Sequence, residues 1–399
     1  MSTRYVIVGG GLAAASAIEG IREIDTDGEI VLLAAERELP YHRPPLSKGY
    51  LAGREQGESV RIHEPAWYRS NGVRVKLGQV ARSVHRKKRS ITLESGERES
   101  YDRLLLATGS RARRLNAPGA DSAGIVHLRT LGDSGQLRAL LKPGVRLVCV
   151  GGGFVGVEVA AAAKDLGADV TVLDSGPHVF RAFADAALGS YFQQLLECRG
   201  IVVQPNVRVT RFRAANGRVA AVQGEKNDQY PADVVVVGVG AEPNTDWLAN
   251  SGLAIDRGGI VVNLRLEAEG EDVWGAGDIV RFPDPVTKQP RRLEHWDNAL
   301  WQGKQAGRNM AGAEEPYIHQ SLFFSDLFDV TVNVLGDTDR PDRVEILGAA
   351  DAKAPQFTAY YVRARKLAGA VMVNLNTVNR TAEFDDLQRH LREGTTPEL

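Results

Sequence analysis

Short, continuously apolar runs along the chain are followed by glycine-rich stretches and then by small residues with helical spacing. Residues 5–8 lead through glycines into a helix expected to end near Glu23, and residues 147–150 lead through glycines into a helix expected to end near Asp165. A short buried run, a glycine turn and a helix are typical of parallel strands that alternate with helices. The pattern therefore predicts an α/β fold that contains the same βαβ unit twice.

Further apolar runs complete this picture. Each unit has a second strand, at residues 29–33 near Glu36 and at residues 169–173 before Asp174. From about residue 316 the pattern changes to alternating apolar and polar positions, which favour antiparallel strands. The remaining predicted elements are a hairpin over 80–93, strands over 104–107, 234–239, 357–362 and 367–373, and a helix over 383–392.

Composition excludes several classes of protein. The chain has 399 residues, 43% of them hydrophobic, with 49 basic and 50 acidic side chains, so neither disorder nor nucleic-acid binding is indicated. The longest apolar run, 234–239, is too short to cross a bilayer, and the first residues lead directly into a strand rather than a signal peptide. We therefore expect a cytoplasmic protein without a membrane span. Eight histidines without ligand-like spacing suggest no metal site.

The first glycine cluster has the chemistry of a dinucleotide site. Gly9 permits a tight turn, Gly11 lets backbone N–H groups approach a pyrophosphate at the helix N-terminus, and Ala14 stands where a third glycine is common. Glu36, 22 residues beyond Ala14, can accept hydrogen bonds from a ribose.

The second cluster repeats this arrangement. Gly151, Gly153 and Gly156 complete a GxGxxG motif, and Asp174 follows Gly156 by 18 residues. One such motif is weak evidence because glycines also serve helix packing, but two complete strand–loop–helix–strand–acid units predict that the chain binds two dinucleotides.

Other motifs carry a family resemblance. They are Pro-Tyr-His-Arg-Pro-Pro-Leu-Ser-Lys at 40–48, Ala-Thr-Gly at 107–109, Gly-Ala-Gly-Asp at 275–278 and Glu-His-Trp-Asp-Asn-Ala at 294–299. With the two glycine loops, they make nearly the whole chain resemble the glutathione reductase-like flavoprotein reductases with two Rossmann-like domains. The most similar branches are the ferredoxin reductases, including putidaredoxin reductase-like and dioxygenase-system reductases, and apoptosis-inducing factor.

The resemblance implies a domain order and a reaction. It places an FAD-binding domain at 1–112 and 246–315, an NADH-binding domain at 113–245 and a small α+β interface domain at 316–399. It implies hydride transfer from NADH to the flavin and then single-electron transfer to a ferredoxin-type iron–sulfur protein. The sequence leaves open whether the protein forms a homodimer.

The resemblance also assigns site residues. Lys48 and Glu158 would form an ion pair beside the flavin and act in catalysis with Trp296, whose alternative role is core packing. Asp278 would contact the ribityl chain, with a helix N-cap as the alternative or additional role. The implied FAD contacts are Gly9, Gly11, Ala14, Glu36, Arg43, Lys48, Ala107, Thr108, Gly109, Asp278, Glu294, His295, Trp296 and Phe324. The implied NADH contacts are Gly151, Gly153, Gly156, Glu158, Asp174 and Gly240.

Two departures from the family pattern refine the function. Residues 42–48 contain no cysteine, and Cys149 and Cys198 lie in an expected strand and an expected helix, which argues against disulfide or peroxide reduction. The stretch Phe-Phe-Ser-Asp-Leu-Phe-Asp at 323–329 is closer to apoptosis-inducing factor, so the alternative is an NADH-responsive flavoprotein with slow turnover and redox-dependent assembly.

Coenzyme choice depends on charge at the end of the second strand. Asp174 favours NADH because its carboxylate would repel the 2′-phosphate of NADPH. His178 and Arg181 are the nearby residues that could supply a compensating cation.

Overall fold

The computed structural model describes residues 2–270, 272–351, 355–375 and 382–397. The chain folds into two compact units, each assembled from three segments of the sequence. Unit 1 comprises Met1–His42, Glu58–Arg111 and Glu242–Ser321, and unit 2 comprises Arg43–Gly57, Ala112–Ala241 and Leu322–Leu399. These two units are defined by how the backbone packs and not by which cofactor each part binds. The three-domain division expected above therefore remains a proposal.

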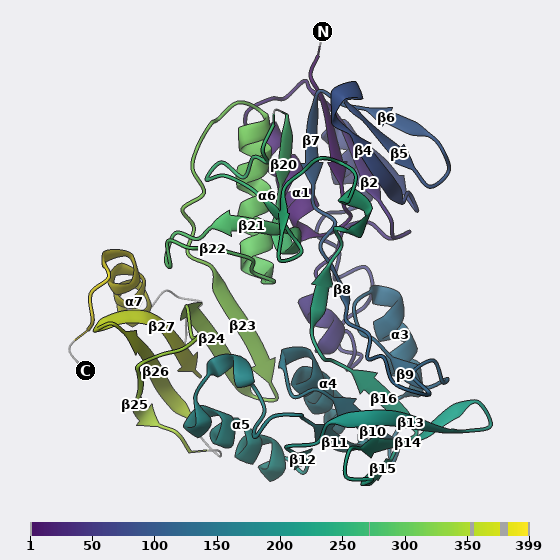
Figure 1. Ribbon diagram of the computed structural model, residues 1–399, viewed down its shortest axis with the longest axis vertical. Coiled ribbons are helices and arrows are strands. Elements are labelled where there is room, and N and C mark those ends of the chain that lie inside the picture. Colours follow the sequence, from purple (N-terminus) through teal and green to yellow (C-terminus); the bar gives the residue numbers. More distant parts are fainter. Residues whose placement is uncertain (1, 271, 352–354, 376–381, 398–399) are drawn as a thin grey trace. The chain divides into compact units, whose positions relative to one another are not determined.

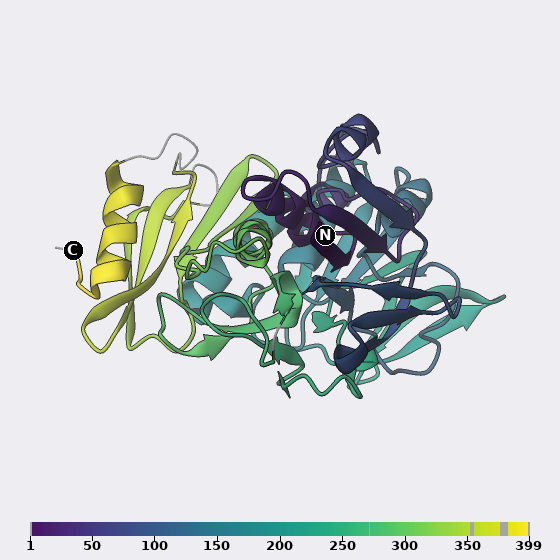
Figure 2. The same ribbon diagram turned by 90° about the horizontal axis from the view of Figure 1, so that it is seen from above.

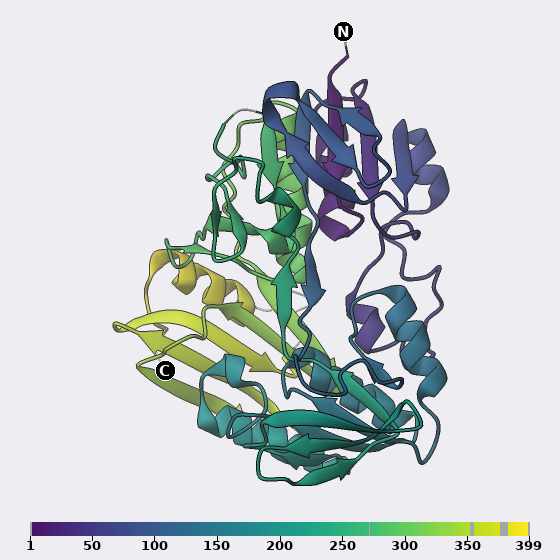
Figure 3. The ribbon, with the colours of Figure 1, turned by 45° about the vertical axis from the view of Figure 1, so that its right-hand side comes forward.

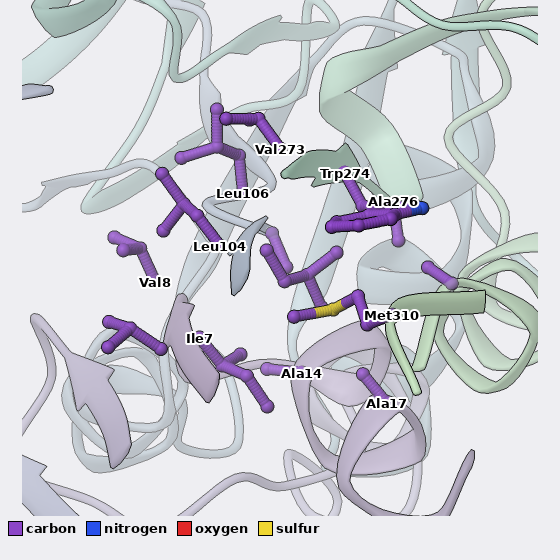
Figure 4. Packing of buried hydrophobic residues seen from close by; sticks show 14 of the residues in the cluster. Ile7, Val8, Ala14, Ala17, Leu104, Leu106, Val273, Trp274, Ala276 and Met310 are labelled. Atoms are coloured by element: carbon purple, nitrogen blue, oxygen red, sulfur yellow. The ribbon is translucent and has the colours of Figure 1, made fainter. Parts of the chain in front are cut away.

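Unit 1 is built on a parallel sheet of five strands in the order β20-β7-β1-β2-β3. Their bounds are β1 (Arg4–Val8), β2 (Glu29–Ala34), β3 (Val73–Leu77), β7 (Arg103–Leu106) and β20 (Val273–Gly275). Ile7 of β1, Ala14 and Ala17 of helix α1 (Leu12–Arg22), and Met310 of helix α6 (Trp296–Met310) belong to one buried cluster (Figure 4). This core anchors β1 and α1, which flank the first glycine loop.

Glycines let α1 and α6 pack side by side (Figure 1). A Cβ atom at Gly303 would lie 2.2 Å from the carbonyl oxygen of Ala13, and one at Gly307 would lie 2.1 Å from that of Ala17. A Cβ atom at Gly20 would lie 2.1 Å from the carbonyl oxygen of Lys304. The backbones of the two helices are therefore in direct contact.

Smaller elements complete unit 1. One three-stranded antiparallel sheet has the order β4-β5-β6, and a four-stranded sheet has the order β18-β19-β21-β22. The bounds are α2 (Pro65–Ser70), β4 (Ala81–His85), η2 (Arg86–Lys88), β5 (Ser90–Leu93), β6 (Arg98–Ser100), η4 (Asp246–Leu248), β18 (Ile255–Asp256), β19 (Gly259–Val261), η5 (Gly277–Ile279), β21 (Val280–Pro283) and β22 (Pro290–Arg291). The hairpin predicted over 80–93 is confirmed as β4 and β5.

Unit 2 contains a second parallel sheet, in the order β12-β11-β10-β16-β9. The strands are β9 (Ile125–Val126), β10 (Arg146–Val150), β11 (Asp169–Leu173), β12 (Val202–Gln204) and β16 (Val234–Val237), and the helical segments are η1 (Pro44–Ser47), α3 (Leu131–Leu140), α4 (Phe154–Asp165), η3 (Arg181–Phe183) and α5 (Ala186–Cys198). A three-stranded sheet, drawn in teal in Figure 3, comprises β13 (Val209–Ala215), β14 (Arg218–Gly224) and β15 (Gln229–Pro231). Strands β8 (Ser110–Ala112) and β17 (Ala241–Pro243) carry the chain from one unit to the other.

The last part of unit 2 is an antiparallel sheet with the strand order β23-β24-β27-β26-β25. Its elements are β23 (Leu322–Leu327), β24 (Val330–Gly336), β25 (Arg343–Ala349), β26 (Gln356–Arg363), β27 (Lys366–Val373) and α7 (Ala382–Glu393). Helix α7 buries Phe384, Leu387 and Leu391 and packs beside this sheet (Figure 2). Two parallel sheets with a final α+β part confirm the predicted fold class. Within the described ranges, no helix has both the length and the apolar character that crossing a membrane requires.

Candidate functional site

The first glycine loop of unit 1 is shaped by backbone contacts. Gly9 has φ +142°, and a Cβ atom there would lie 2.1 Å from the carbonyl oxygen of Ala107. Both its conformation and this close approach require glycine. Gly11 is the N-cap of α1 without a side-chain cap, and the space that its Cβ would enter is open. Because the first N–H groups of a helix lack intrahelical partners, this opening fits an anionic group such as a phosphate.

Glu36, the acidic residue of the first glycine unit, accepts a hydrogen bond from a residue nearby in the sequence. The hydroxyl of Tyr41 donates a hydrogen bond to Glu36 Oε2 at 2.5 Å. Ala14, which stands where the second loop has a glycine, is fully buried in α1. Glu36 is thus oriented near the end of β2, as a ribose-binding carboxylate requires.

The segment around Thr108 is fixed by Asn244, which sequence reasoning did not single out. Thr108 Oγ1 donates to the carbonyl oxygen of Asn244 at 2.8 Å, and Asn244 Nδ2 donates to the carbonyl oxygen of Thr108 at 3.0 Å. The backbone N–H of Asn244 also donates to Gly109. These reciprocal bonds hold residues 107–109 directly after β7.

Asp278 lies in the short helix η5, whose N-cap is Ala276, so the predicted N-cap role of Asp278 is wrong. The helical turn starts at Gly277, which has φ +80°, so Asp278 is already its second residue. Asp278 Oδ2 accepts a hydrogen bond from Ser110 Oγ at 2.5 Å.

A buried donor lies beside this turn. Gln302 is fully buried, and its Oε1 accepts from the Gly277 N–H at 2.9 Å. Among the residues that the structure describes, none accepts a hydrogen bond from Gln302 Nε2. An unpaired buried amide is costly, so this atom fits a polar ligand group.

The start of α6 brings several expected site residues together. Trp296 is half-buried, and its Nε1 donates to His42 Nδ1 at 3.1 Å. Burial, and to a lesser extent nearby His63, lowers the pKa of His42, which agrees with a neutral acceptor nitrogen. His295 is the N-cap of α6, and burial lowers its pKa to about 4. Glu294 instead pairs with Arg292.

The second glycine loop, in unit 2, repeats the first. Gly151 has φ +108°, and a Cβ there would lie 2.4 Å from the carbonyl oxygen of Gly238. A Cβ at Gly156 would lie 2.0 Å from the carbonyl oxygen of Gly151, which explains the third glycine. Gly153, the N-cap of α4, has open space like Gly11.

Asp174 and Gly240, two of the expected NADH contacts in unit 2, form hydrogen bonds within the protein. Buried Asp174 accepts hydrogen bonds from the backbone N–H groups of Gly152 at 2.7 Å and Gly176 at 2.6 Å. It also forms an ion pair with Arg181, in which Asp174 Oδ1 and Arg181 Nε are 3.1 Å apart. Gly240 has φ +109°, and its carbonyl oxygen accepts from the Arg113 N–H.

Lys48 and Glu158 form the expected ion pair, with Lys48 Nζ 2.9 Å from Glu158 Oε1. The Lys48 side chain is 14% exposed and that of Glu158 is 7% exposed. Ser47 Oγ donates to Glu158 Oε2 at 2.5 Å, and Ser325 Oγ donates to Oε1 at 2.6 Å. Sequence reasoning missed both serines, although each lies inside a quoted motif next to an assigned residue.

Phe324 and Arg43, two residues expected at the FAD site, lie in the same unit as this ion pair. Lys48 Nζ is 5.8 Å from the ring centroid of Phe324, in β23. Arg43 Nη1 donates to the carbonyl oxygen of Arg129 at 2.6 Å. Unit 2 therefore brings Lys48, Glu158 and Phe324 together with Ser47 and Ser325.

Comparison with known proteins decides the family. Residues 3–303 match the family described as pyridine nucleotide-disulphide oxidoreductase. The chain belongs to this family. It is 36% identical over 384 residues, 96% of this chain and 92% of the relative, to the biphenyl dioxygenase system ferredoxin–NAD(+) reductase component of Paraburkholderia xenovorans (strain LB400). It is 36% identical over 333 residues, 83% of this chain and 81% of the relative, to the anthranilate 1,2-dioxygenase system ferredoxin–NAD(+) reductase component of Burkholderia cepacia.

A solved structure supports the same assignment. The putidaredoxin reductase–putidaredoxin covalent complex contains a chain that matches with a TM-score of 0.92 and 29% identity, covering 98% of this chain and 93% of that chain. The predicted resemblance to ferredoxin reductase-type proteins is confirmed, and the protein is an oxidoreductase.

The cysteines of this pyridine nucleotide-disulphide oxidoreductase are both free. Cys149 is buried in β10, and burial raises its pKa to about 12, so it remains a thiol at neutral pH. Cys198 is exposed at the last position of α5. In the part of the chain that the structure describes, no group of three or more His, Cys, Asp or Glu side chains is placed to hold a metal ion.

Proposed function

We propose that the protein is an FAD-dependent NADH oxidoreductase that reduces a ferredoxin-type iron–sulfur protein. The observation that carries the proposal is the pair of matching glycine loops, each with an open N-cap glycine at Gly11 or Gly153. The names of the relatives, ferredoxin–NAD(+) reductase components, support the acceptor. A cytoplasmic location and the FAD, NADH and interface domain boundaries given above belong to the same proposal.

Unit 1 would hold FAD. The Gly9–Gly11 loop fits the pyrophosphate, Glu36 fits the adenosine ribose, and the unpaired Nε2 of Gln302 beside Asp278 fits a polar flavin or ribityl group. FMN has neither the pyrophosphate nor the adenosine ribose. Denaturing the purified protein should release FAD, as judged by chromatography. Stoichiometric FMN, or a folded sample that binds no flavin, would contradict the assignment.

Unit 2 would hold NADH at the Gly151–Gly156 loop. When bound, the two cofactors supply hydride transfer from nicotinamide to flavin and then release of single electrons. Lys48 would place a fixed positive charge next to the flavin, where it stabilises the negative charge gained on reduction. Glu158 would hold Lys48 in place, and Ser47 and Ser325 would fix the Glu158 carboxylate.

The deciding experiment is rapid mixing of the flavoprotein with NADH and a [2Fe–2S] ferredoxin. We expect fast loss of the oxidised-flavin absorbance, followed by ferredoxin reduction at a rate comparable with turnover. Slow flavin reduction with no ferredoxin reduction would instead support an NADH-responsive protein like apoptosis-inducing factor, the alternative suggested by residues 323–329.

A further inference from the structure

The indole of Trp296 is held by a histidine from a distant part of the sequence. Trp296 Nε1 donates a hydrogen bond to His42 Nδ1 at 3.1 Å, across 254 positions. The two ring centroids are 5.7 Å apart and the ring planes are tilted by 44°, so the contact is a hydrogen bond and not a stack. Both residues belong to unit 1. Sequence reasoning assigned Trp296 to the flavin but gave no role to His42.

The backbone of His42 is tied to another segment of unit 1. Its N–H donates to the Val60 carbonyl oxygen at 2.7 Å. The preceding residue, Tyr41, is buried and forms an antiparallel bridge with Arg61. The imidazole therefore extends from paired backbone, which limits the positions that its ring can take.

The backbone of Trp296 is fixed as well. Trp296 is the first residue of α6, and further along this helix Gly303 and Gly307 lie directly against the backbone of α1. The helix cannot shift without breaking these contacts, whereas the Trp296 side chain is only half-buried. The hydrogen bond to His42 is thus a contact that orients the indole on a fixed helix.

This hydrogen bond requires a neutral His42. A neutral imidazole has one N–H and one acceptor nitrogen, and because Nδ1 accepts here, the proton lies on Nε2. An imidazolium carries a proton on both nitrogens, so its Nδ1 proton would meet the indole N–H. Protonation of His42 therefore breaks the bond to Trp296.

The surroundings keep His42 neutral at neutral pH. Burial and, to a lesser extent, positive charge on His63 lower the pKa of His42 below the ordinary histidine value of about 6.5. Charged groups of the neighbouring segments face partners of their own: His63 with Glu19 of α1, Arg61 with Glu58 and Glu64, Glu36 with Tyr41, Asp297 of α6 with His319, and Arg43 with the Arg129 carbonyl oxygen. His42 thus gains its proton only as the pH falls through a value below about 6.5.

We propose that His42 is a positioning residue for Trp296: its neutral imidazole holds the indole, and its protonation releases the indole. This inference rests on the proposed function only where it treats Trp296 as a side chain at the flavin. There, a released indole lowers the rate of ferredoxin reduction, because the reaction depends on the orientation of the groups at the site.

The test is NMR of the indole N–H signals of the purified full-length flavoprotein between about pH 7.5 and about pH 5. The signal that is missing in Trp296→Phe belongs to Trp296. In the parent, we expect this signal to move upfield as the pH falls, because an N–H proton that loses its acceptor is less deshielded. The midpoint should lie below about pH 6.5 and coincide with that of the His42 ring signals.

Two substitutions separate the acceptor from the titration. His42→Asn keeps an acceptor oxygen close to the position of Nδ1 but does not titrate in this range, so the Trp296 signal should hold its neutral-pH position throughout. His42→Leu removes the acceptor. In that variant the Trp296 indole N–H should exchange with solvent about two- to tenfold faster, the factor for one neutral hydrogen bond. If His42→Leu does not fold, the parent and His42→Asn decide the question.

His63→Asn is the matched control, because His63 is also in contact with a tryptophan. It stacks on Trp67 with ring centroids 3.7 Å apart. The substitution should move the Trp67 signal and leave the Trp296 signal at neutral pH unchanged. It should also raise the midpoint of the Trp296 titration, because it removes the cation that helps to lower the pKa of His42.

The outcomes separate this inference from the proposed function. A Trp296 signal that ignores pH in the parent, or that titrates equally in His42→Asn, would overturn the inference. Ferredoxin reduction should fall about two- to tenfold with His42 protonation in the parent but not in His42→Asn, and identical pH profiles would remove His42 from the reaction. A Trp296 signal that titrates as expected in a protein that reduces no ferredoxin at any pH would overturn the proposed function alone.

Discussion

At the scale of single residues, the carboxylate of Glu158 is held by three side chains. Its buried carboxylate receives Lys48, Ser47 and Ser325, which come from the η1 loop and from β23, while Glu158 itself lies in α4. A buried charge is tolerated when it is paired and hydrogen-bonded. These four residues therefore form a unit whose members depend on one another.

Replacing Lys48 by Met should slow flavin reduction by NADH by roughly tenfold or more, because it removes the cation proposed to stabilise the reduced flavin. Glu158 keeps its two serine donors, so the fold should survive. Rapid-mixing kinetics and the flavin midpoint potential are the measurements. Lys164→Met is the control, because Lys164 lies in α4, the helix that carries Glu158. If both quantities are unchanged in Lys48→Met, Lys48 has no role at the flavin.

The pKa of His295 predicts a specific pH dependence. Its pKa is lowered to about 4 by burial, whereas an unfolded histidine has a pKa of about 6.5. As pH falls from about 6.5 to 4, the unfolded chain takes up the proton first, so stability is lost over that interval and is fully present above it.

His295→Gln should reduce this acid sensitivity by roughly 1–3 kcal/mol, and His85→Gln, an exposed control, should not. Histidine NMR titration checks the premise directly. A His295 resonance that titrates near pH 6.5 in the folded protein would show that folding does not lower the pKa of this side chain.

The cysteines should be dispensable for turnover. A Cys149→Ala, Cys198→Ala double variant should keep NADH-dependent ferredoxin reduction, because the buried Cys149 thiol, with a pKa of about 12, is not a nucleophile at neutral pH and neither cysteine belongs to the proposed site. Removing the buried sulfur of Cys149 should cost roughly 1 kcal/mol of stability. Steady-state assays on folded, flavin-loaded protein are decisive, and lost turnover there would indicate thiol chemistry.

At the scale of elements, the contact between α1 and α6 supports the first glycine loop, where we propose that FAD binds. Gly307→Ala would place a methyl group 2.1 Å from the Ala17 carbonyl oxygen. Separating the helices should cost about 2–3 kcal/mol and lower flavin content. Flavin fluorescence measures both quantities: the temperature at which flavin is released reports stability, and the total signal released reports flavin content.

Gly135→Ala provides the matched control in helix α3. Its added Cβ would meet its nearest neighbour, Tyr50 Oη, at 3.7 Å, an ordinary contact. We expect no loss, and up to about 1 kcal/mol of added stability from helix propensity. Equal effects of the two substitutions would mean that close helix packing is not what Gly307 provides.

At the scale of the whole molecule, we propose that the protein passes electrons to a separate protein. NADH should therefore leave the molar mass unchanged in size-exclusion chromatography with light scattering, whether the chain is a monomer or a homodimer. An NADH-dependent increase in mass would favour the alternative resembling apoptosis-inducing factor. Measuring mass with NAD⁺ as well separates nucleotide binding from flavin reduction.

The sequence by itself determined the duplicated units. Gly9 and Gly151 must be glycine because of positive φ and a nearby carbonyl, and such local requirements leave a pattern in the sequence. The strands over 5–8, 147–150 and 169–173 and the final helix over 383–392 followed from apolar spacing, since burial imposes that spacing. Lys48 and Glu158 could be paired only through a family resemblance, because nothing local links them.

Only the tertiary structure decided which side chains surround these positions. Ser325 reaches Glu158 across 167 positions of sequence, and Asn244 reaches Thr108 across 136. No spacing rule covers such contacts. Asp174 shows the same limit, because its position at the strand end was readable but its bond to Gly152, 22 positions earlier, depends on how the glycine loop packs against the segment after β11. Local sequence restricts the backbone, whereas the partners of a charged group are fixed only when distant segments pack.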